Sequence, residues 1–289
     1  MKKRTITLIA GPTASGKSDF ALKLAQENEA VIVNADSMQV YSVLDIITAR
    51  PSREDMALIP HYLYGYIAPD EHYSTGKWLK DAIAILENIE LPLIFVGGTG
   101  LYFKALTEGL AEIPDIPDCI REKWRDKLKN EGSLTLYKML ETIDEPVARR
   151  LSDRDGQRII RALEVYEATG KTLSYWQSRK TRPAFENENV EKLLLLPDRN
   201  VVYERIEKRF DKMVENGALN EARALDKLGL APSMPAMKAI GIPEFIDVLK
   251  GRKTIQAAIE EAKTNTRRYA KRQMTWFRHQ LGDDWKKVP

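Results

Sequence analysis

A glycine-rich segment near the N-terminus has the residue types and spacing of a phosphate-binding loop. It fits the pattern G-x-x-x-x-G-K-[ST] through Gly11, Pro12, Thr13, Ala14, Ser15, Gly16, Lys17 and Ser18. Its glycines let the backbone curl so that successive N–H groups point at phosphate oxygens, and a helix that begins here adds its partial positive charge. Lys17 is placed to neutralise phosphate, and the Ser18 hydroxyl to ligate Mg²⁺. The segment therefore predicts a site for a pyrophosphate-bearing small molecule, with Mg²⁺ as cofactor.

Two further side chains are expected at the same site. A P-loop enzyme usually holds Mg²⁺ with an acid that follows an apolar strand, but the apolar run at 93–96 leads into Gly-Gly-Thr-Gly at 97–100, with no carboxylate. The run at 31–33 leads instead to Asp36. Because the carboxyl ends of parallel strands line the ligand crevice, Asp36 and Thr99 should lie near the phosphates. Asp36 could also simply cap the turn after its strand, and the glycines around Thr99 could serve only a tight turn.

Apolar runs alternate with helical patterns in the part of the chain that must position these residues. Strands are expected at 5–10, 31–33, 93–96 and 193–196, because each run is short, apolar and closed by Gly, Pro, Asn or Asp. Amphipathic helices are expected at 16–28 and 77–89. Continuous apolar strands that alternate with helices indicate a parallel sheet covered on both faces. The expected fold class is therefore α/β, with a P-loop NTPase-like parallel sheet and helices on both faces.

The character of the chain changes between residues 116 and 189. This segment is rich in helical patterns, shows no convincing strand pattern and is bounded by proline and polar breaks. Residues 121–180 hold 14 Lys and Arg against 10 Asp and Glu, a net charge of +4, whereas the whole chain carries +3. The positive excess is thus concentrated in this segment. We expect a P-loop catalytic core made of 1–115 and 190–289, and a helical insertion domain made of 116–189.

The overall composition excludes several classes of protein. Apolar residues make up 43% of the 289 residues, and the 30% of charged residues are well mixed, which favours a globular enzyme over a disordered chain. The single cysteine, Cys119, excludes an intrachain disulfide and a multi-cysteine zinc site, and we expect it to be a small buried residue. No stretch approaches the roughly 20 apolar residues of a membrane span. A cytoplasmic protein is expected.

A second basic segment lies near the C-terminus. From residue 263 to residue 278 it carries six basic residues and no acid, with Tyr269, Trp276 and Phe277 between them. Aromatic residues in this setting suit either core packing or base stacking, and the basic residues could equally form a solvated helix face. The three histidines are too scattered to suggest a metal site.

The motifs together resemble those of the bacterial tRNA dimethylallyltransferases, also called tRNA isopentenyltransferases. Nine of them occur in the family's order over nearly the whole chain: GPTASGKS at 11–18, NADSMQVY at 34–41, TARP at 48–51, PHYL at 60–63, VGGTGLYFKAL at 96–106, QRIIRALEVYEATGKTLS at 157–174, RIEKRFDKMV at 205–214, PAMKAIG at 235–241 and TRRYAKRQMTWFR at 266–278. Three places depart from the family's pattern. Ile47 stands for a glycine, Tyr62 for a histidine, and Ile242, with Pro243 after it, for an aromatic residue.

The resemblance implies a P-loop core with a helical insertion that binds tRNA. The family's reaction transfers a dimethylallyl group from dimethylallyl diphosphate to N6 of the adenine 3′ of the anticodon. The implied base is Asp36, with Thr99 and Lys17 as further catalytic residues and Arg209, in preference to Arg205, as an additional ligand of the diphosphate. The expected partners are dimethylallyl diphosphate and the anticodon stem-loop of tRNA, without a membrane, and the protein is expected to be a monomer. Contacts with tRNA are expected from Asp36, Ser37, Met38, Gln39, Thr99, Arg121, Gln157, Arg158, Ile159, Ile160 and Arg161.

Two other functions explain part of the sequence. A small-molecule kinase of the nucleotide-kinase type would bind ATP on the P-loop and use the insertion as a lid. That function accounts neither for the missing acid after residues 93–96 nor for the later motifs. An RNA-binding, GTPase-like module would use the P-loop as a switch, but the chain lacks a guanine-reading motif of the Asn-Lys-x-Asp type.

Overall fold

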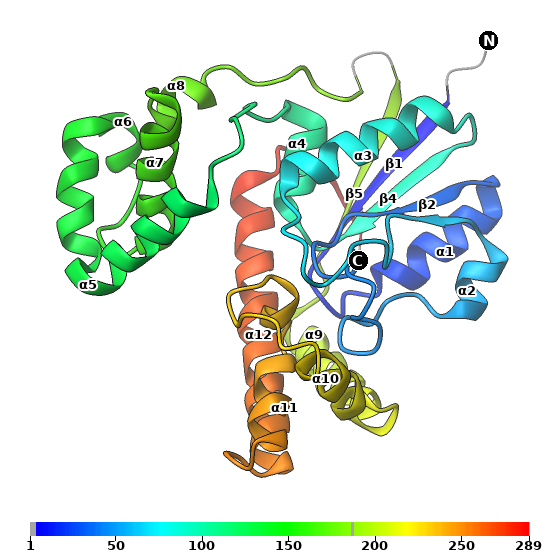
Figure 1. Cartoon of the computed structure of the whole chain (residues 1–289). Coiled ribbons are helices and arrows are strands. Elements are labelled where there is room, and N and C mark those ends of the chain that lie inside the picture. Colours follow the sequence, from blue (N-terminus) through cyan, green and yellow to red (C-terminus); the bar gives the residue numbers. More distant parts are fainter. Residues whose placement is uncertain (1–3, 186–187, 289) are drawn as a thin grey trace. The chain divides into compact units, whose positions relative to one another are not determined.

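The computed structural model describes residues 4–185 and 188–288 of the chain. The chain divides into two compact units, one formed by Met1–Thr107 with Phe185–Pro289 and the other by Glu108–Ala184 (Figure 1). Each unit has its own apolar core. Within the described ranges, no helix is long and apolar enough to cross a membrane.

The second unit begins and ends a few residues earlier than the predicted insertion, 116–189. An isolated antiparallel bridge joins Ala111 to Lys180. The segment that leads into the insertion therefore pairs with the segment that leaves it, and both belong to the second unit. At the other end, the ring of Phe185 packs against Phe95 of the sheet, with centroids 6.0 Å apart, so the chain returns to the first unit before residue 189.

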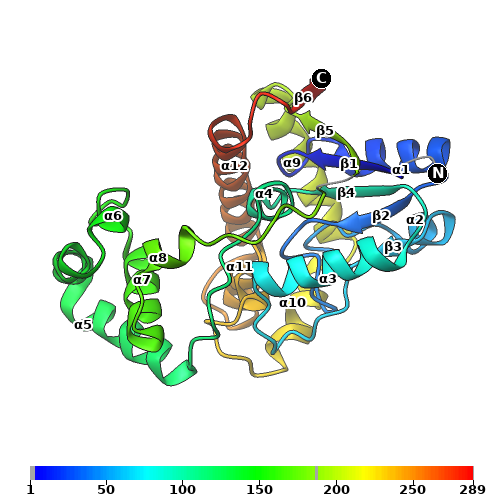
Figure 2. The ribbon, with the colours of Figure 1, turned by 90° about the horizontal axis from the view of Figure 1, so that it is seen from above.

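A six-stranded sheet forms the centre of the first unit, in the order β3-β2-β4-β1-β5-β6 (Figure 2). All neighbouring pairs are parallel, which confirms the predicted α/β class. The strands are β1 (Thr5–Ala10), β2 (Val31–Asn34), β3 (His61–Tyr62), β4 (Leu93–Gly97), β5 (Asn189–Leu195) and β6 (Lys286–Val288). The sequence predicts β1, β2, β4 and β5. Two or three residues are too few to give β3 and β6 a recognisable hydrophobic pattern.

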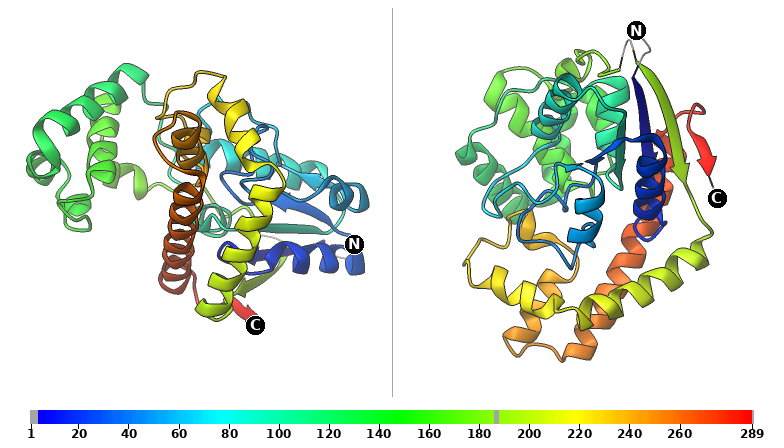
Figure 3. Two further views of the ribbon diagram at one scale, coloured as in Figure 1. Left: turned by 90° about the horizontal axis from the view of Figure 1, so that it is seen from below. Right: turned by 90° about the vertical axis from the view of Figure 1, so that its right-hand side faces the viewer.

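The helices of the first unit flank this sheet or extend beyond its carboxyl edge (Figure 3). They are α1 (Lys17–Asn28), α2 (Arg53–Leu58), α3 (Thr75–Asn88), α4 (Gly100–Glu108), α9 (Arg199–Glu215), α10 (Ala218–Asp226), the 3₁₀ helix η1 (Ala236–Lys238), α11 (Ile242–Leu249) and α12 (Ile255–Gln280). The helices predicted at 16–28 and 77–89 are α1 and α3. The start of α3 is fixed by Ser74, whose side chain accepts a hydrogen bond from the N–H of Lys77.

Helices cover both faces of the sheet (Figure 2). On one face, Ile94 packs into the cluster that contains the buried alanines of α1. On the other face, Phe95 meets Trp78 of α3 with ring centroids 6.5 Å apart, and Trp78 stacks on Tyr102 of α4 at 4.0 Å. Consecutive residues of β4 thus point to opposite faces and both are buried, as expected for a parallel strand between two helical layers.

The long helix α12 carries the basic segment predicted at 263–278, and it packs against α9 (Figure 3). Lys263 is buried, and its ammonium lies 3.4 Å from a carboxylate oxygen of Glu207 and 2.7 Å from one of Asp211, both on α9. Phe277 is 1% exposed. Lys263 therefore joins α12 to α9, and Phe277 belongs to the buried core, so neither residue lies on a solvated face.

The second unit is built from helices α5 (Asp118–Ile143), α6 (Glu145–Ala148), α7 (Gly156–Thr169) and α8 (Leu173–Gln177). Their buried apolar residues form one core, with Trp124 from α5, Val147 from α6, Leu163 from α7 and Leu173 from α8. The expectation that Cys119 is buried is wrong, because the first turn of α5 leaves it exposed.

Candidate functional site

The P-loop, residues 11–18, makes a tight turn between β1 and α1. Ala14 and Gly16 have φ angles of 61° and 89°, in the left-handed region that glycine adopts most readily. The N–H of Ser15 donates to the carbonyl of Pro12 at 3.2 Å. Because α1 begins at Lys17, the free N–H groups of its first turn face the loop. This arrangement can hold an anion at the N-terminus of the helix.

Lys17 and Arg209 bring two partly buried cations to the P-loop. The Lys17 ammonium donates to the carbonyl of Pro12 at 3.2 Å. Burial lowers the pKa of Lys17 to about 8; the Asp36 carboxylate opposes this shift and Arg209 adds to it. Burial also lowers the pKa of Arg209 to about 10, again against the opposing charge of Asp36. Both cations are poorly solvated, so an anionic ligand would stabilise their charged forms.

Helix α9 supplies two arginines to the P-loop. Arg205 Nη1 donates to the carbonyl of Ser15 at 3.0 Å, and the guanidinium of Arg209 donates to the hydroxyl of Thr13. The two arginines are four positions apart and therefore share one face of the helix. Both contact the loop, but Arg209 is the one whose charge interacts with Lys17 and Asp36.

Asp36 and Thr99 follow the neighbouring strands β2 and β4, and the structure brings their loops together. The N–H of Thr99 donates to the carbonyl of Ala35 at 3.1 Å. In return, Thr99 Oγ1 accepts a hydrogen bond from the N–H of Ser37 at 2.9 Å. The hydroxyl of Thr99 therefore keeps its own proton available for a further acceptor.

The carboxylate of Asp36 is held from one side. Its Oδ1 accepts hydrogen bonds from the N–H groups of Met38, at 2.9 Å, and Gln39, at 3.4 Å. Its Oδ2 lies 3.5 Å from the point where a Cβ of Gly98 would stand. The turn-capping role that the sequence allows is thus carried by Oδ1, while Oδ2 faces the glycine turn after β4.

Three tyrosines from different elements lie close enough to this carboxylate for its charge to affect their pKa values. Burial raises the pKa of Tyr64, Tyr102 and Tyr269, and the negative charge of Asp36 adds to each shift. Tyr64 follows β3, Tyr102 lies on α4 and Tyr269 on α12. No local pattern marks Tyr64 or Tyr102 as site residues, because their approach to Asp36 depends on how three separate elements pack.

Gln273 of α12 joins the P-loop to the turn after β4. Its Oε1 accepts a hydrogen bond from the N–H of Thr13 at 2.9 Å, and its Nε2 donates to the carbonyl of Gly98 at 2.8 Å. A Cβ at Gly98 would lie 2.4 Å from Nε2, so this close approach requires glycine. One turn further along α12, the ring of Trp276 fills the space beside Gly100. Nothing in the local sequence around Gln273 indicates this role.

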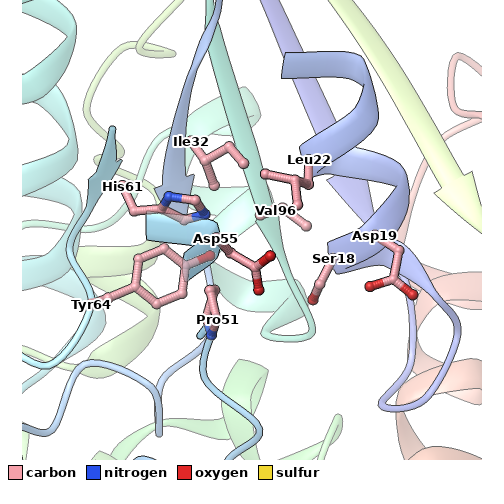
Figure 4. Close-up of a pocket in the computed structure, with 9 residues that line it drawn as sticks. All are labelled: Ser18, Asp19, Leu22, Ile32, Pro51, Asp55, His61, Tyr64 and Val96. Atoms are coloured by element: carbon pink, nitrogen blue, oxygen red, sulfur yellow. The ribbon is translucent and has the colours of Figure 1, made fainter. Parts of the chain in front are cut away.

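A small cavity of about 30 Å³ adjoins Ser18 at the start of α1 (Figure 4). Its polar lining consists of Ser18, Asp19, Asp55, His61 and Tyr64, and apolar side chains complete it. Burial lowers the pKa of His61. Hydroxyl and carboxylate oxygens are the ligands that Mg²⁺ prefers, usually together with water and substrate phosphates. In the part of the chain that the structure describes, no group of three or more His, Cys, Asp or Glu side chains could hold a metal by itself.

Two polar side chains fix the segment that follows Asp36. Gln39 Nε2 donates to the carbonyls of Thr48 and Ala49 at 2.8 and 3.1 Å. Glu221 of α10 accepts hydrogen bonds from the N–H groups of residues 45, 46 and 47 at 3.0, 2.7 and 3.0 Å. Burial raises the pKa of Glu221, and these three hydrogen bonds oppose that shift. The amide donors of Gln39 are therefore engaged inside the protein, where they shape the segment.

Two of the residues expected to contact tRNA are in the core of the second unit. Ile159 and Ile160 are 0% and 5% exposed and pack among the buried apolar residues of α5, α6 and α8. A contact of these two residues with tRNA, which stays a prediction, would therefore have to be made through their backbone. They occupy the apolar face of α7, which must be covered for that helix to be stable.

The remaining expected tRNA residues of the second unit are accessible. Gln157 and Arg158 are exposed, and Arg121 and Arg161 are partly buried. Each arginine lies near an acid three positions away: Arg121 at 3.9 Å from Asp118, Arg158 at 3.5 Å from Asp155, and Arg161 at 3.6 Å from Glu164. Their charges are therefore partly compensated in the free protein.

Comparisons with known proteins agree over almost the whole chain. A sequence model of the family described as IPP transferase matches residues 39–280. The tRNA dimethylallyltransferase of Bartonella henselae is 59% identical over 286 residues, which cover 99% of each chain. The protein of the same name from Chelativorans sp. is 53% identical and covers 98% of each chain.

Two solved structures extend the comparison. The full-length tRNA isopentenylpyrophosphate transferase of Bacillus halodurans has a TM-score of 0.69 at 33% identity, covering 99% of this chain and 90% of that chain. A eukaryotic dimethylallyltransferase acting on tRNA has a TM-score of 0.82 at 27% identity, covering 99% of this chain and 73% of that chain.

Proposed function

The chain belongs to the IPP transferase family, and from this premise we propose that it transfers a dimethylallyl group from dimethylallyl diphosphate to N6 of the adenine 3′ of the anticodon in tRNA. Diphosphate is the second product. The relatives' name, tRNA dimethylallyltransferase, describes a prenyltransferase that acts on tRNA. The observation that carries the proposal is that an anion-binding loop, a carboxylate and a free hydroxyl meet at one edge of the sheet.

We assign to Asp36 the role of accepting the proton that the reaction releases. The lone pair of the exocyclic amine is delocalised into the adenine ring, which makes the amine a weak nucleophile. As the amine attacks C1 of the dimethylallyl group, an N–C bond forms, the C–O bond to diphosphate breaks, and the nitrogen must lose a proton. The Oδ2 of Asp36, which faces Gly98 and is not the oxygen that caps the turn, can take it. The hydroxyl of Thr99 can donate to a ring nitrogen of the same base, because Ser37 occupies only its acceptor side.

The P-loop stabilises the leaving group. Negative charge accumulates on the diphosphate as the C–O bond breaks, and the N–H groups at the start of α1 point toward that charge. Lys17 and Arg209 add two positive charges from poorly solvated positions, where each interaction with an anion is stronger than in water. The binding of the donor and the departure of diphosphate thus depend on the same groups.

Mg²⁺ fits the residues present at the start of α1. The Ser18 hydroxyl would hold it directly, and the carboxylates of Asp19 and Asp55 line the adjoining cavity. When bound, the ion would neutralise part of the charge on the diphosphate oxygens.

The acceptor adenine must leave the anticodon stack to reach Asp36, as bases do in other enzymes that modify them. The partly buried phenol rings of Tyr64 and Tyr269 offer flat, largely apolar surfaces near that carboxylate, whereas Tyr102 is 2% exposed and stacked on Trp78. Outside this site, the accessible residues Arg121, Gln157, Arg158 and Arg161 are the proposed tRNA contacts on the second unit, from the set that the resemblance implies.

A labelling experiment tests the reaction. The purified protein is incubated with a tRNA transcript and either labelled dimethylallyl diphosphate or γ-labelled ATP. The proposal expects label from dimethylallyl diphosphate in the tRNA and loss of that label when the adenine 3′ of the anticodon is replaced by guanine. Phosphate transfer from ATP, without prenyl transfer, would instead identify a kinase.

A further inference from the structure

Two cations of the second unit meet on one aromatic ring. The ammonium of Lys171 lies 5.3 Å, and the guanidinium carbon of Arg179 4.6 Å, from the centroid of the Tyr175 ring on α8. Each is within the range of a cation–π interaction. The two like charges therefore lie within about 10 Å of each other, roughly one Debye length at moderate salt.

Arg150 adds a third cation beside α8. Its Nη2 donates to Oε1 of Gln177 on that helix at 3.0 Å, and its Nε donates to the carbonyl of Pro146 at 2.9 Å. These bonds hold the guanidinium in place, but they involve neutral acceptors and leave its charge uncompensated. Among residues 4–185 and 188–288, which the structure describes, no acidic side chain forms an ion pair with Arg150, Lys171 or Arg179.

This cluster differs from other basic residues of the same unit. Arg149, next to Arg150 in the chain, is paired with Glu145 at 2.5 Å, and Lys123 is paired with Glu167 at 2.8 Å. Paired cations of this kind are already partly neutralised, so they gain less from an external anion. Lys171 and Arg179 repel each other beside the Tyr175 ring, and an anion that binds between them relieves that repulsion. Arg150 offers a further uncompensated charge at the same helix.

We propose that the α8 surface, defined as Arg150, Lys171, Tyr175 and Arg179, binds the sugar–phosphate backbone of the tRNA substrate. The inference rests on the proposed function, in which tRNA is the polyanion that the protein must hold. Tyr175 and Gln177 restrict the cations before binding, so less side-chain freedom is lost when phosphates dock. Contacts of this kind position the RNA and do not read its bases.

A charge-matched pair of variants tests the surface. The first carries Arg150→Gln, Lys171→Gln and Arg179→Gln; the control carries Lys127→Gln, Lys129→Gln and Lys138→Gln on α5. Both lose three positive charges from the second unit, so a general electrostatic effect acts on them alike. Unmodified tRNA is titrated against each full-length variant at several salt concentrations, and thermal melting confirms that both are folded.

The α8 variant is expected to bind tRNA more weakly and to reduce the slope of log Kd against log salt by about two to three, because each phosphate that is no longer neutralised keeps its counterion. The control should change the slope by less than about one. The single variant Tyr175→Leu should weaken tRNA binding. The single variant Tyr175→Phe should bind tRNA as the wild type does, because phenylalanine keeps the ring that holds Lys171 and Arg179. Weakened tRNA binding by Tyr175→Phe would show that the aromatic ring does not position these two cations for tRNA.

The outcomes separate this inference from the proposed function. Equal slopes for the two triple variants would overturn the α8 surface, as would an α8 variant with wild-type affinity and slope. If the wild-type protein itself neither binds tRNA nor transfers the dimethylallyl group, the proposed function fails first. Labelling of tRNA by the wild type together with unchanged binding by the α8 variant would reject the surface alone.

Discussion

The side chain of Gln273 is hydrogen-bonded to the backbone of Thr13, with a distance of 2.9 Å between Oε1 and the amide nitrogen. The other end of the same amide holds the carbonyl of Gly98 at 2.8 Å. One buried side chain therefore sets the spacing between the P-loop and the turn that carries Thr99. In the proposed reaction, the first of these segments binds the donor and the second contacts the acceptor.

Replacement of Gln273 by leucine should lower kcat by about tenfold or more, because a small misplacement of reacting groups is costly to rate. The backbone groups of Thr13 and Gly98 would also be left without partners, at a stability cost of roughly 1–3 kcal/mol for each buried group. The measurement compares kcat, the Kd of an unreactive dimethylallyl diphosphate analogue and the melting temperature. Gln256→Leu, at an exposed position of the same helix, is the control. A lower melting temperature with unchanged kcat would show that Gln273 acts on stability alone.

Asp36→Asn should reduce turnover by roughly two to four decades, in line with the contribution of a general base. Asparagine keeps a carbonyl oxygen that can accept the hydrogen bonds from Met38 and Gln39, so the shape of the loop should survive. Binding of tRNA should therefore persist. Single-turnover rates, measured with a tRNA titration on the same preparation, check both parts, and near-normal turnover would assign the base to another residue.

The affinity for the donor should depend on pH through Lys17. Its pKa is lowered to about 8 by burial, whereas a bound diphosphate would favour the charged form and raise that pKa. Affinity should therefore be constant below about pH 8 and fall by up to about tenfold per unit as pH rises above it. Arg209, with a pKa of about 10, remains charged over most of this window. Calorimetry with an unreactive analogue between about pH 7 and 9.5 measures the profile.

Lys17→Met is the matched control for this profile. It should bind the analogue more weakly throughout, and without the decrease above about pH 8, because the titrating group is absent. A wild-type profile that stays flat over the same range, or one that Lys17→Met shares, would contradict a role for Lys17 in holding the diphosphate.

Replacement of Arg121, Arg158 and Arg161 by alanine should weaken tRNA binding and lower its salt dependence by about one for each arginine–phosphate interaction removed. Because each arginine lies near an acid that partly compensates its charge, the slope change per residue should not exceed this value. Affinity for the small donor should hardly change. Salt titrations of tRNA give the slopes, and parallel slopes for wild type and variant would exclude these arginines as tRNA contacts. Loss of donor affinity with unchanged tRNA binding would indicate a nucleotide lid.

Features that depend on neighbours in the chain are readable from the residues alone. The turn of 11–18 follows from its glycines and from the helix that starts at Lys17, and four strands follow from short apolar runs closed by turn residues. The α/β class follows from their alternation with helices. The order of nine motifs also indicates the family, which the match to residues 39–280 and the relatives confirm.

The tertiary structure alone decides which distant residues complete the site. Gln273, Tyr269 and Arg209 approach the P-loop or Asp36 from elements about 200 or more positions later in the chain. In the sequence, these residues look like any others of an amphipathic helix. Only the packing of α9 and α12 beside the sheet brings their side chains to the site. In the second unit, the packing of the helices likewise buries the side chains of Ile159 and Ile160, although both lie within a motif that suggests tRNA contact. Backbone turns are set by local torsion preferences, whereas the surroundings of a side chain are set by long-range packing, which a linear pattern does not encode.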